Sequence, residues 1–168
     1  MKSFILLFLL FINLYAMEDR QSLMDTISQH AIRIGSGPNK VYAFVDPLCS
    51  KSQSYIELIS TRKDLQNHTS YYIFLDQLQK FDSKEFIVHI YQSDDPLSSL
   101  QDIMIYKDYD IDFNETTENA SLIIEKISKV AKQMEIKRRP YLLLIDEGSK
   151  YCRVSEGTAP CLEENDFD

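Results

Sequence analysis

An apolar run ends in a tight turn, a cysteine and a helical pattern, and these residues constrain the chain most. Residues 41–45 read as a buried strand, Asp46-Pro47 as a turn, and residues 50–62 as a helix. Cys49 therefore stands at the first turn of that helix, where unpaired backbone N–H groups and the helix dipole favour an anion. A thiolate is such an anion and is the nucleophilic form of cysteine. We take Cys49 as the candidate nucleophile.

The residue three positions after Cys49 is Ser52, which makes the motif C-x-x-S. A dithiol site resolves its own mixed disulfide, whereas a single thiol needs an external thiol for release. Cys49 could still form mixed disulfides or isomerise a substrate by attack and release. The alternative is a vestigial cysteine on a scaffold used only for binding. Ser52 could donate a hydrogen bond to a Cys49 thiolate, or it could simply solvate the helix.

The N-terminus indicates export. Residues 1–16 contain a short positive region, an apolar core and a small residue at a plausible cleavage site, as in a secretory signal peptide. An uncleaved anchor is the alternative, and after cleavage we expect no membrane span. The net charge of −8 becomes −9 without Lys2, so nucleic acid and anionic membranes are poor partners. We expect a periplasmic or secreted protein.

Three cysteines follow the leader, and in an oxidising compartment disulfides persist. Because three is odd, at least one thiol is free or externally paired. Cys152 and Cys161 are candidate disulfide partners; a Cys49–Cys161 pair and no stable bridge remain open. The three histidines are scattered and none has ligand spacing to a cysteine, so we predict no metal and no cofactor.

The rest of the chain alternates strands and helices. We predict a helix and linker over residues 17–39, with apolar positions up to Ile34, and one domain over residues 40–168. Residues 71–75 are a second strand, and residues 77–137 a helical insert whose clearest helix includes residues 123–134. Residues 141–145 and 150–155 form a hairpin. The order predicts an α/β fold with a β-α-β unit, a helical insert, a long helix and a C-terminal β-hairpin.

Two segments resemble the bacterial Dsb thiol–disulfide proteins. Residues 40–49, KVYAFVDPLC, resemble their active-site strand, especially in the isomerase branch. Residues 131–146, AKQMEIKRRPYLLLID, resemble their helix, loop, cis-proline and strand. The resemblance implies a thioredoxin-like fold. It also implies that Pro140 is cis and sets the backbone of Arg139 beside Cys49 as an edge for a substrate strand. An ordinary trans proline is the alternative.

The chain departs from that family in four places. Ser52 replaces the resolving cysteine, and Arg138-Arg139 stand where the family usually has glycine and threonine or valine. After removal of residues 1–16, only about twenty residues would precede the first strand, too few for the dimerisation domain of the isomerase branch. We therefore expect a monomer. The C-terminal helix is expected to be unusually short.

Two further groups near the cysteine have open roles. Arg138 and Arg139 could stabilise the Cys49 thiolate or pair with surface carboxylates. The basic triplet at residues 137–139 could contact an acidic partner or form a solvated loop. Asp46 could tune proton transfer or initiate the Asp-Pro turn.

The sequence thus predicts an exported thioredoxin-like protein that acts in thiol–disulfide exchange or isomerisation. Cys49, Ser52 and Pro140 are the candidate catalytic residues, and Arg139 the candidate substrate contact. The partners would be cysteine-containing exported proteins or a redox partner. A non-catalytic thioredoxin-like binding or assembly module is the alternative.

Overall fold

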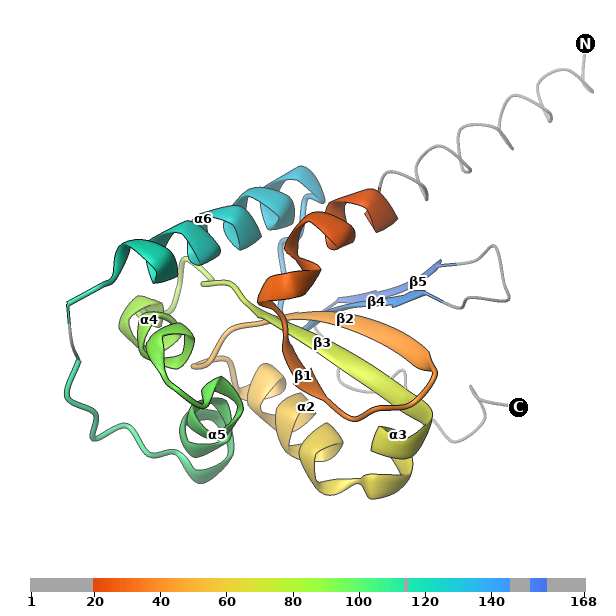
Figure 1. Ribbon diagram of the computed structural model, residues 1–168, viewed down its shortest axis with the longest axis horizontal. Coiled ribbons are helices and arrows are strands. Elements are labelled where there is room, and N and C mark those ends of the chain that lie inside the picture. The colour runs from red at the N-terminus through yellow and green to blue at the C-terminus, as the bar shows by residue number, and fades with distance from the viewer. Residues whose placement is uncertain (1–19, 114, 146–151, 157–168) are drawn as a thin grey trace, which may run out of the picture.

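The computed structural model describes residues 20–113, 115–145 and 152–156. A five-stranded sheet runs through it in the order β1-β3-β2-β4-β5 (Figure 1). The strand bounds are β1 Ile32–Ile34, β2 Asn39–Val45, β3 Thr69–Leu75, β4 Tyr141–Ile145 and β5 Cys152–Glu156. The three central strands are apolar because helices cover both faces of the sheet, as expected for an α/β fold.

The predicted β-α-β unit is present. β2 and β3 are parallel, with Val41 opposite Tyr71 and Val45 opposite Leu75. Two helices connect them, α2 Ser50–Thr61 and α3 Lys63–His68, and the second of these was not predicted. β4 lies antiparallel on the other side of β2, with Phe44 opposite Tyr141, and β5 completes the hairpin. The C-terminal ends of β2 and β3 and the start of β4 therefore lie side by side at the same end of the three central strands.

The N-terminal segment differs from the prediction of a single helix up to Ile34. Residues 20–27 are helical, a short 3-10 turn follows at Ser28–His30, and residues 32–34 form β1 against β3. Gly35 has φ 79°, a left-handed conformation that glycine adopts easily, and it ends the strand. Ile32 and Ile34 are buried while Arg33 between them is exposed, so the local pattern has the period of a strand.

The insert contains helices, as predicted. These are α4 Lys84–Gln92, α5 Pro96–Gln101 with a π-helical turn at Asp102–Tyr106, and α6 Glu118–Gln133. Asp95 caps α5 by accepting from Ser98 N, and Thr117 caps α6 by accepting from Ala120 N. Both caps satisfy backbone donors that a helix start leaves free, so the sequence itself sets these helix boundaries.

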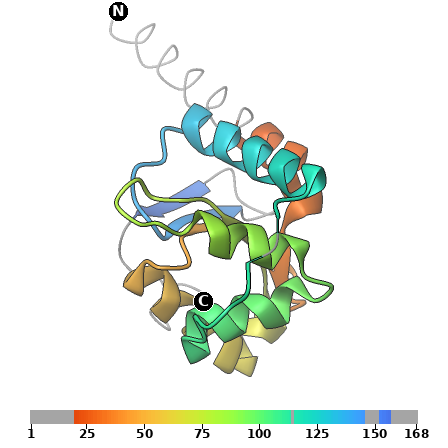
Figure 2. The same cartoon turned by 90° about the vertical axis from the view of Figure 1, so that its left-hand side faces the viewer.

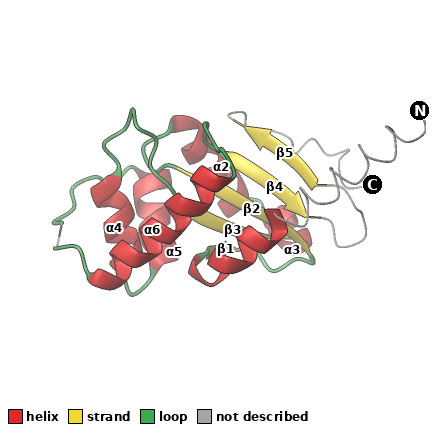
Figure 3. Ribbon diagram, turned by 90° about the horizontal axis from the view of Figure 1, so that it is seen from above, coloured by secondary structure: helices red, strands yellow, loops and turns green. Residues whose placement is uncertain are grey.

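Two hydrophobic cores lie on opposite faces of the sheet. The N-terminal helix and α6 cover one face, where Ile127 and Val130 pack on Phe44 and Phe74. α2, α4 and α5 cover the other face, where Ile59 and Ile90 pack on Ala43. Figure 2 shows the sheet between the two helical layers, and Figure 3 views the sheet from the side of α6. Alternate residues of β2 thus enter alternate cores.

Several predictions concern residues outside the described ranges. The proposed signal peptide, Cys161 and the acidic C-terminal segment belong to this group, so the Cys152–Cys161 bridge remains a prediction. Within the described ranges, no helix combines the length and apolar character that a membrane crossing requires.

Candidate active site at Cys49

Cys49 lies at the edge of the sheet where β2 leads into α2. It is the N-cap residue of α2, with an extended backbone, and its carbonyl accepts from Gln53 N at 2.9 Å. Its own N–H donates to Asp46 O at 3.1 Å, which closes the Asp-Pro turn. The Cys49 side chain is only 5% exposed. The turn therefore holds the sulfur at the start of a helix, as the sequence predicted.

The loop before β4 reaches the sulfur from the other side. The Arg139–Pro140 peptide is cis, as the resemblance implied, and β4 begins at the next residue. Cys49 Sγ donates to Arg139 O across 3.7 Å. The two segments that the sequence analysis selected, 90 residues apart, are thus in direct contact.

The side chain of Arg139 turns inward and forms an ion pair with Asp76. The two side chains are only 3% and 11% exposed. Burial raises the pKa of Asp76, and the nearby Arg139 guanidinium opposes that rise. Arg139 was expected to stabilise a thiolate or to pair at the surface; it pairs instead with a buried carboxylate. Its Nε has no hydrogen-bond partner in the described part of the chain.

Sequence reasoning missed Asp76, although a signal was present. Asp46 and Asp76 each directly follow one of two parallel strands, and Val45 lies opposite Leu75. Because parallel strands end at the same edge of a sheet, both carboxylates lie near the turn that carries Cys49. Asp76 N donates to Val45 O at 2.9 Å, which continues the strand pairing up to this edge.

Asp46 is completely buried and fully hydrogen-bonded. Its Oδ1 accepts from Leu48 N at 2.9 Å, which is the turn role that the sequence suggested. Its Oδ2 accepts from Leu78 N at 2.6 Å and from Ser83 Oγ at 3.0 Å. Asp46 therefore fixes both the Cys49 turn and the segment between β3 and α4.

Ser52 does not occupy the role of thiolate partner. Its hydroxyl is buried and accepts from Asp46 N at 3.3 Å. Among the described residues, no hydrogen bond joins Ser52 to Cys49, so the predicted thiolate contact is not seen. The alternative, that Ser52 simply solvates the helix, is not seen either, because Ser52 is completely buried and serves the backbone of Asp46.

A cavity of about 870 Å³ opens beside Cys49. It is bounded by the start of α2, the loop after β3, the end of α6 and the loop before Pro140. The wall residues from these four segments include Cys49, Asp76, Leu78, Phe81, Ala131, Ile136 and Arg139. The volume falls within the range of pockets that hold small ligands or peptide side chains.

The chain is similar to known proteins in structure but not detectably in sequence. No protein-family model and no curated protein matches the chain. Solved structures do match, although their identities are low. The disulfide interchange protein from Neisseria gonorrhoeae has a TM-score of 0.61 at 16% identity, over 80% of this chain and 89% of that one. The catalytic domain of Proteus mirabilis ScsC has 0.60 at 14%, over 88% and 91%. Helicobacter pylori DsbG has 0.60 at 17%, over 76% and 61%.

The chain has the thioredoxin-like fold of Dsb proteins. The α/β order that we read from the sequence is therefore correct, with the helical insert between β3 and β4. At these identities the likeness concerns the fold alone, and the chemistry must be argued from the residues of this chain.

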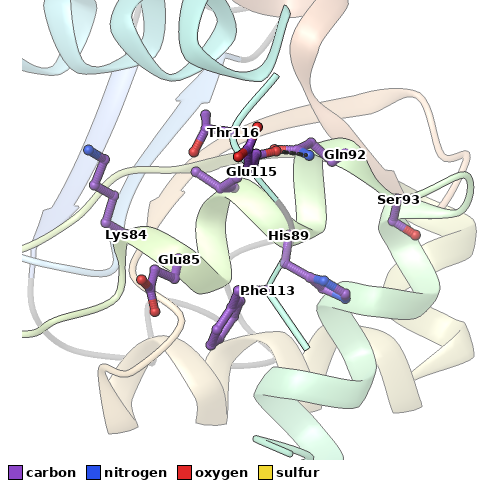
Figure 4. A pocket seen from close by; sticks show the side chains of 9 residues that line it. Lys84, Glu85, His89, Gln92, Ser93, Phe113, Glu115 and Thr116 are labelled. Atoms are coloured by element: carbon purple, nitrogen blue, oxygen red, sulfur yellow. Dashed lines mark hydrogen bonds between the residues drawn. The ribbon is translucent and has the colours of Figure 1, made fainter. Parts of the chain in front are cut away.

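A second cavity, of about 460 Å³, lies away from the cysteine. Figure 4 shows side chains of α4, among them His89 and Gln92, facing Phe113, Glu115 and Thr116 on the segment that precedes α6. Gln92 Nε2 donates to Glu115 O at 3.1 Å, and Thr117 N donates to Gln92 Oε1 at 3.2 Å. These contacts attach the segment that precedes α6 to α4. No cysteine and no buried ion pair is among the residues that line this cavity.

Metal binding finds no support in the described ranges. Nowhere in them do three or more His, Cys, Asp or Glu side chains come close enough to hold an ion. Cys49 is a free thiol there, and none of His30, His68 and His89 lies in the wall of its cavity.

Proposed function

We propose that this chain performs thiol–disulfide exchange through Cys49 alone. One observation carries the proposal: the Cys49 sulfur lies at a helix N-terminus, against the Arg139 carbonyl, at the wall of a cavity. A helix N-terminus stabilises the thiolate, which is the attacking species. The cavity gives a substrate disulfide room to approach.

The reaction has two balanced steps. The Cys49 thiolate attacks one sulfur of a substrate disulfide, forming a mixed disulfide and releasing the other substrate sulfur as a thiolate. A thiol of the same substrate or a small thiol then attacks the mixed disulfide and frees Cys49. When the attacked disulfide and the thiol that releases Cys49 both belong to the substrate, there is no net oxidation or reduction, so the net result is isomerisation. Ser52 has no thiol with which to attack the mixed disulfide at Cys49. Release by a substrate thiol, and hence isomerisation, is therefore favoured.

The setting of the reaction is also proposed. The substrates are cysteine-containing proteins that are exported with this one to the periplasm or outside the cell, and the chain works as a monomer. The leader-like residues 1–16 support export. The direction of exchange depends on the redox partner.

Trapping tests the proposal. The protein is incubated with a small peptide disulfide, and adducts are located by intact mass and peptide mapping. We expect a mixed disulfide at Cys49 that persists, since the chain lacks a cysteine at position 52. Ser52→Cys should shorten the lifetime of the adduct, and Cys49→Ala should remove it. Failure of native Cys49 to react, when the unfolded protein does, would reject exchange.

A binding module is the second candidate, because Cys49 is nearly buried and its thiol already has a hydrogen-bond acceptor. In that case partners would be kept after Cys49→Ser. Under the exchange proposal, covalent capture of partners is lost in that variant.

A further inference from the structure

The cavity beside Cys49 has a charge opposite to that of the whole chain. The chain carries 26 acidic and 18 basic residues, whereas the cavity wall contains six basic residues and one acidic residue. The basic residues are Lys51, Lys80, Lys132, Lys137, Arg138 and Arg139. The acidic residue is Asp76, which Arg139 already neutralises. The remaining charge in the wall is therefore positive.

These cations come from separate elements and converge only in the folded chain. Lys51 lies on α2, Lys80 follows β3, Lys132 lies in the last turn of α6, and Lys137 and Arg138 precede Pro140. Only the basic triplet was visible in the sequence as a cluster. Their convergence gives the cavity a positive potential, which raises the local concentration of an anionic ligand.

Three of these cations form no ion pair with a carboxylate of the described residues. The ion pairs found there are Arg62–Asp64, far from the cavity wall, and Arg139–Asp76. Lys132, Lys137 and Arg138 are exposed and form no ion pair with a described residue. The Lys80 ammonium lies 4.7 Å from the centre of the Phe81 ring, which leaves its charge at the cavity.

We propose that this cavity selects disulfides whose cysteine is flanked by carboxylates, so that the client of Cys49 is an acidic cysteine-containing segment. The inference rests on the exchange reaction proposed above and specifies its substrate. The flanking carboxylates meet Lys132, Lys137 and Arg138 while the disulfide meets the sulfur. A cleft with one sign of charge raises the association rate of an opposite charge by about 10- to 1,000-fold.

The test uses three peptides that differ only in the residues beside one cysteine: aspartates, serines or lysines. Each peptide cysteine carries a thiopyridyl group. The Cys49 thiolate attacks the peptide sulfur, the peptide–pyridyl disulfide breaks, and thiopyridone leaves with the electron pair and takes up a proton. Its absorbance reports the second-order rate constant. We expect the acidic peptide to react at least about tenfold faster than the basic one at low salt.

Salt separates electrostatic selection from other causes. The screening length falls from about 30 Å at 0.01 M ionic strength to about 3 Å at 1 M, so the preference should largely disappear at the higher value. Lys132→Glu/Lys137→Glu should lower the rate with the acidic peptide about tenfold and raise the rate with the basic peptide. Lys63→Glu/Lys126→Glu changes the net charge equally, outside the cavity wall, and should leave the ratio within about twofold.

The outcomes distinguish this inference from the exchange proposal. Equal rates with all three peptides would overturn acidic selection and leave exchange standing. No reaction with any peptide, including the serine one, would overturn both. The mixed disulfide of mercaptoethanesulfonate with thiopyridine, which releases the same thiopyridone, serves as the remaining arm. If it matches the acidic peptide, a small anionic thiol is the source of the recognised charge; if it reacts more slowly, the source is a protein segment.

Discussion

Replacing Arg139 with methionine tests the buried ion pair beneath the cavity. Methionine keeps an unbranched apolar stem, although a shorter one, and removes the cation that Asp76 faces. The Arg139 Nη1 bond to Arg138 O, 3.0 Å long, is lost as well. Removing one partner of a buried pair costs about 3–5 kcal/mol. For a domain of this size, 3 kcal/mol corresponds to a fall in Tm of about 6–12 °C.

The cost should depend on pH in a defined direction. Burial already raises the pKa of Asp76, and loss of Arg139 removes the main influence that lowers it. A carboxyl with a raised folded-state pKa binds its proton more tightly when folded, so stability is retained below the unfolded pKa of about 3.9 and falls as pH rises. The variant should therefore lose little stability near pH 4 and the full amount at pH 7.

Urea unfolding at both pH values measures this difference. Arg138→Met is the matched control, since that neighbour is exposed and should change stability by no more than about 0.5 kcal/mol. Arg139→Met/Asp76→Asn should recover part of the loss, because the uncompensated carboxylate is gone. A loss below about 1 kcal/mol at pH 7, or the same loss at both pH values, would show that our reading of the pair is wrong.

Three further changes test the core, a helix cap and a turn, each measured by denaturant unfolding. Ile59→Ala, at a completely buried position, should cost about 2–5 kcal/mol and Ile59→Val about 0.5–1.5; equal costs would contradict close packing there. Thr117→Ala should cost about 1 kcal/mol through loss of the bond to Ala120 N, with Thr117→Ser near neutral. Gly37→Ala should cost at least about 1–3 kcal/mol, because its Cβ would overlap the backbone of His68 and Thr69; an unchanged Tm would refute that contact.

Local patterns were sufficient where one segment determines its own structure. The strand, Asp-Pro turn, Cys49 and helix follow from residues within a window of about twenty positions, and the structure reproduces them. The core stripe of α6 was equally readable, since Ile127 and Val130 recur on one helical face and both are buried. In contrast, we predicted a helix where β1 lies, because a segment of three residues is too short to distinguish the period of a strand from that of a helix.

Features that depend on distant segments were not readable from local patterns. The Arg139–Asp76 pair joins residues 63 positions apart, and the sequence around either residue does not predict its partner. The same holds for the cation-lined cavity, which draws on four separate elements. Ser52 illustrates a further limit: its type and position were known, but its hydroxyl serves the backbone of Asp46 rather than the sulfur.

The bonds of Asp46 make the first residues of the insert, before α4, necessary for the placement of Cys49. The same carboxylate receives Leu48 N from the cysteine turn and Leu78 N and Ser83 Oγ from the chain that leads into the insert. Excising the insert would leave that buried charge without two of its donors. A minimal domain designed from this chain would therefore have to keep residues 76–83, or replace Asp46 at the same time.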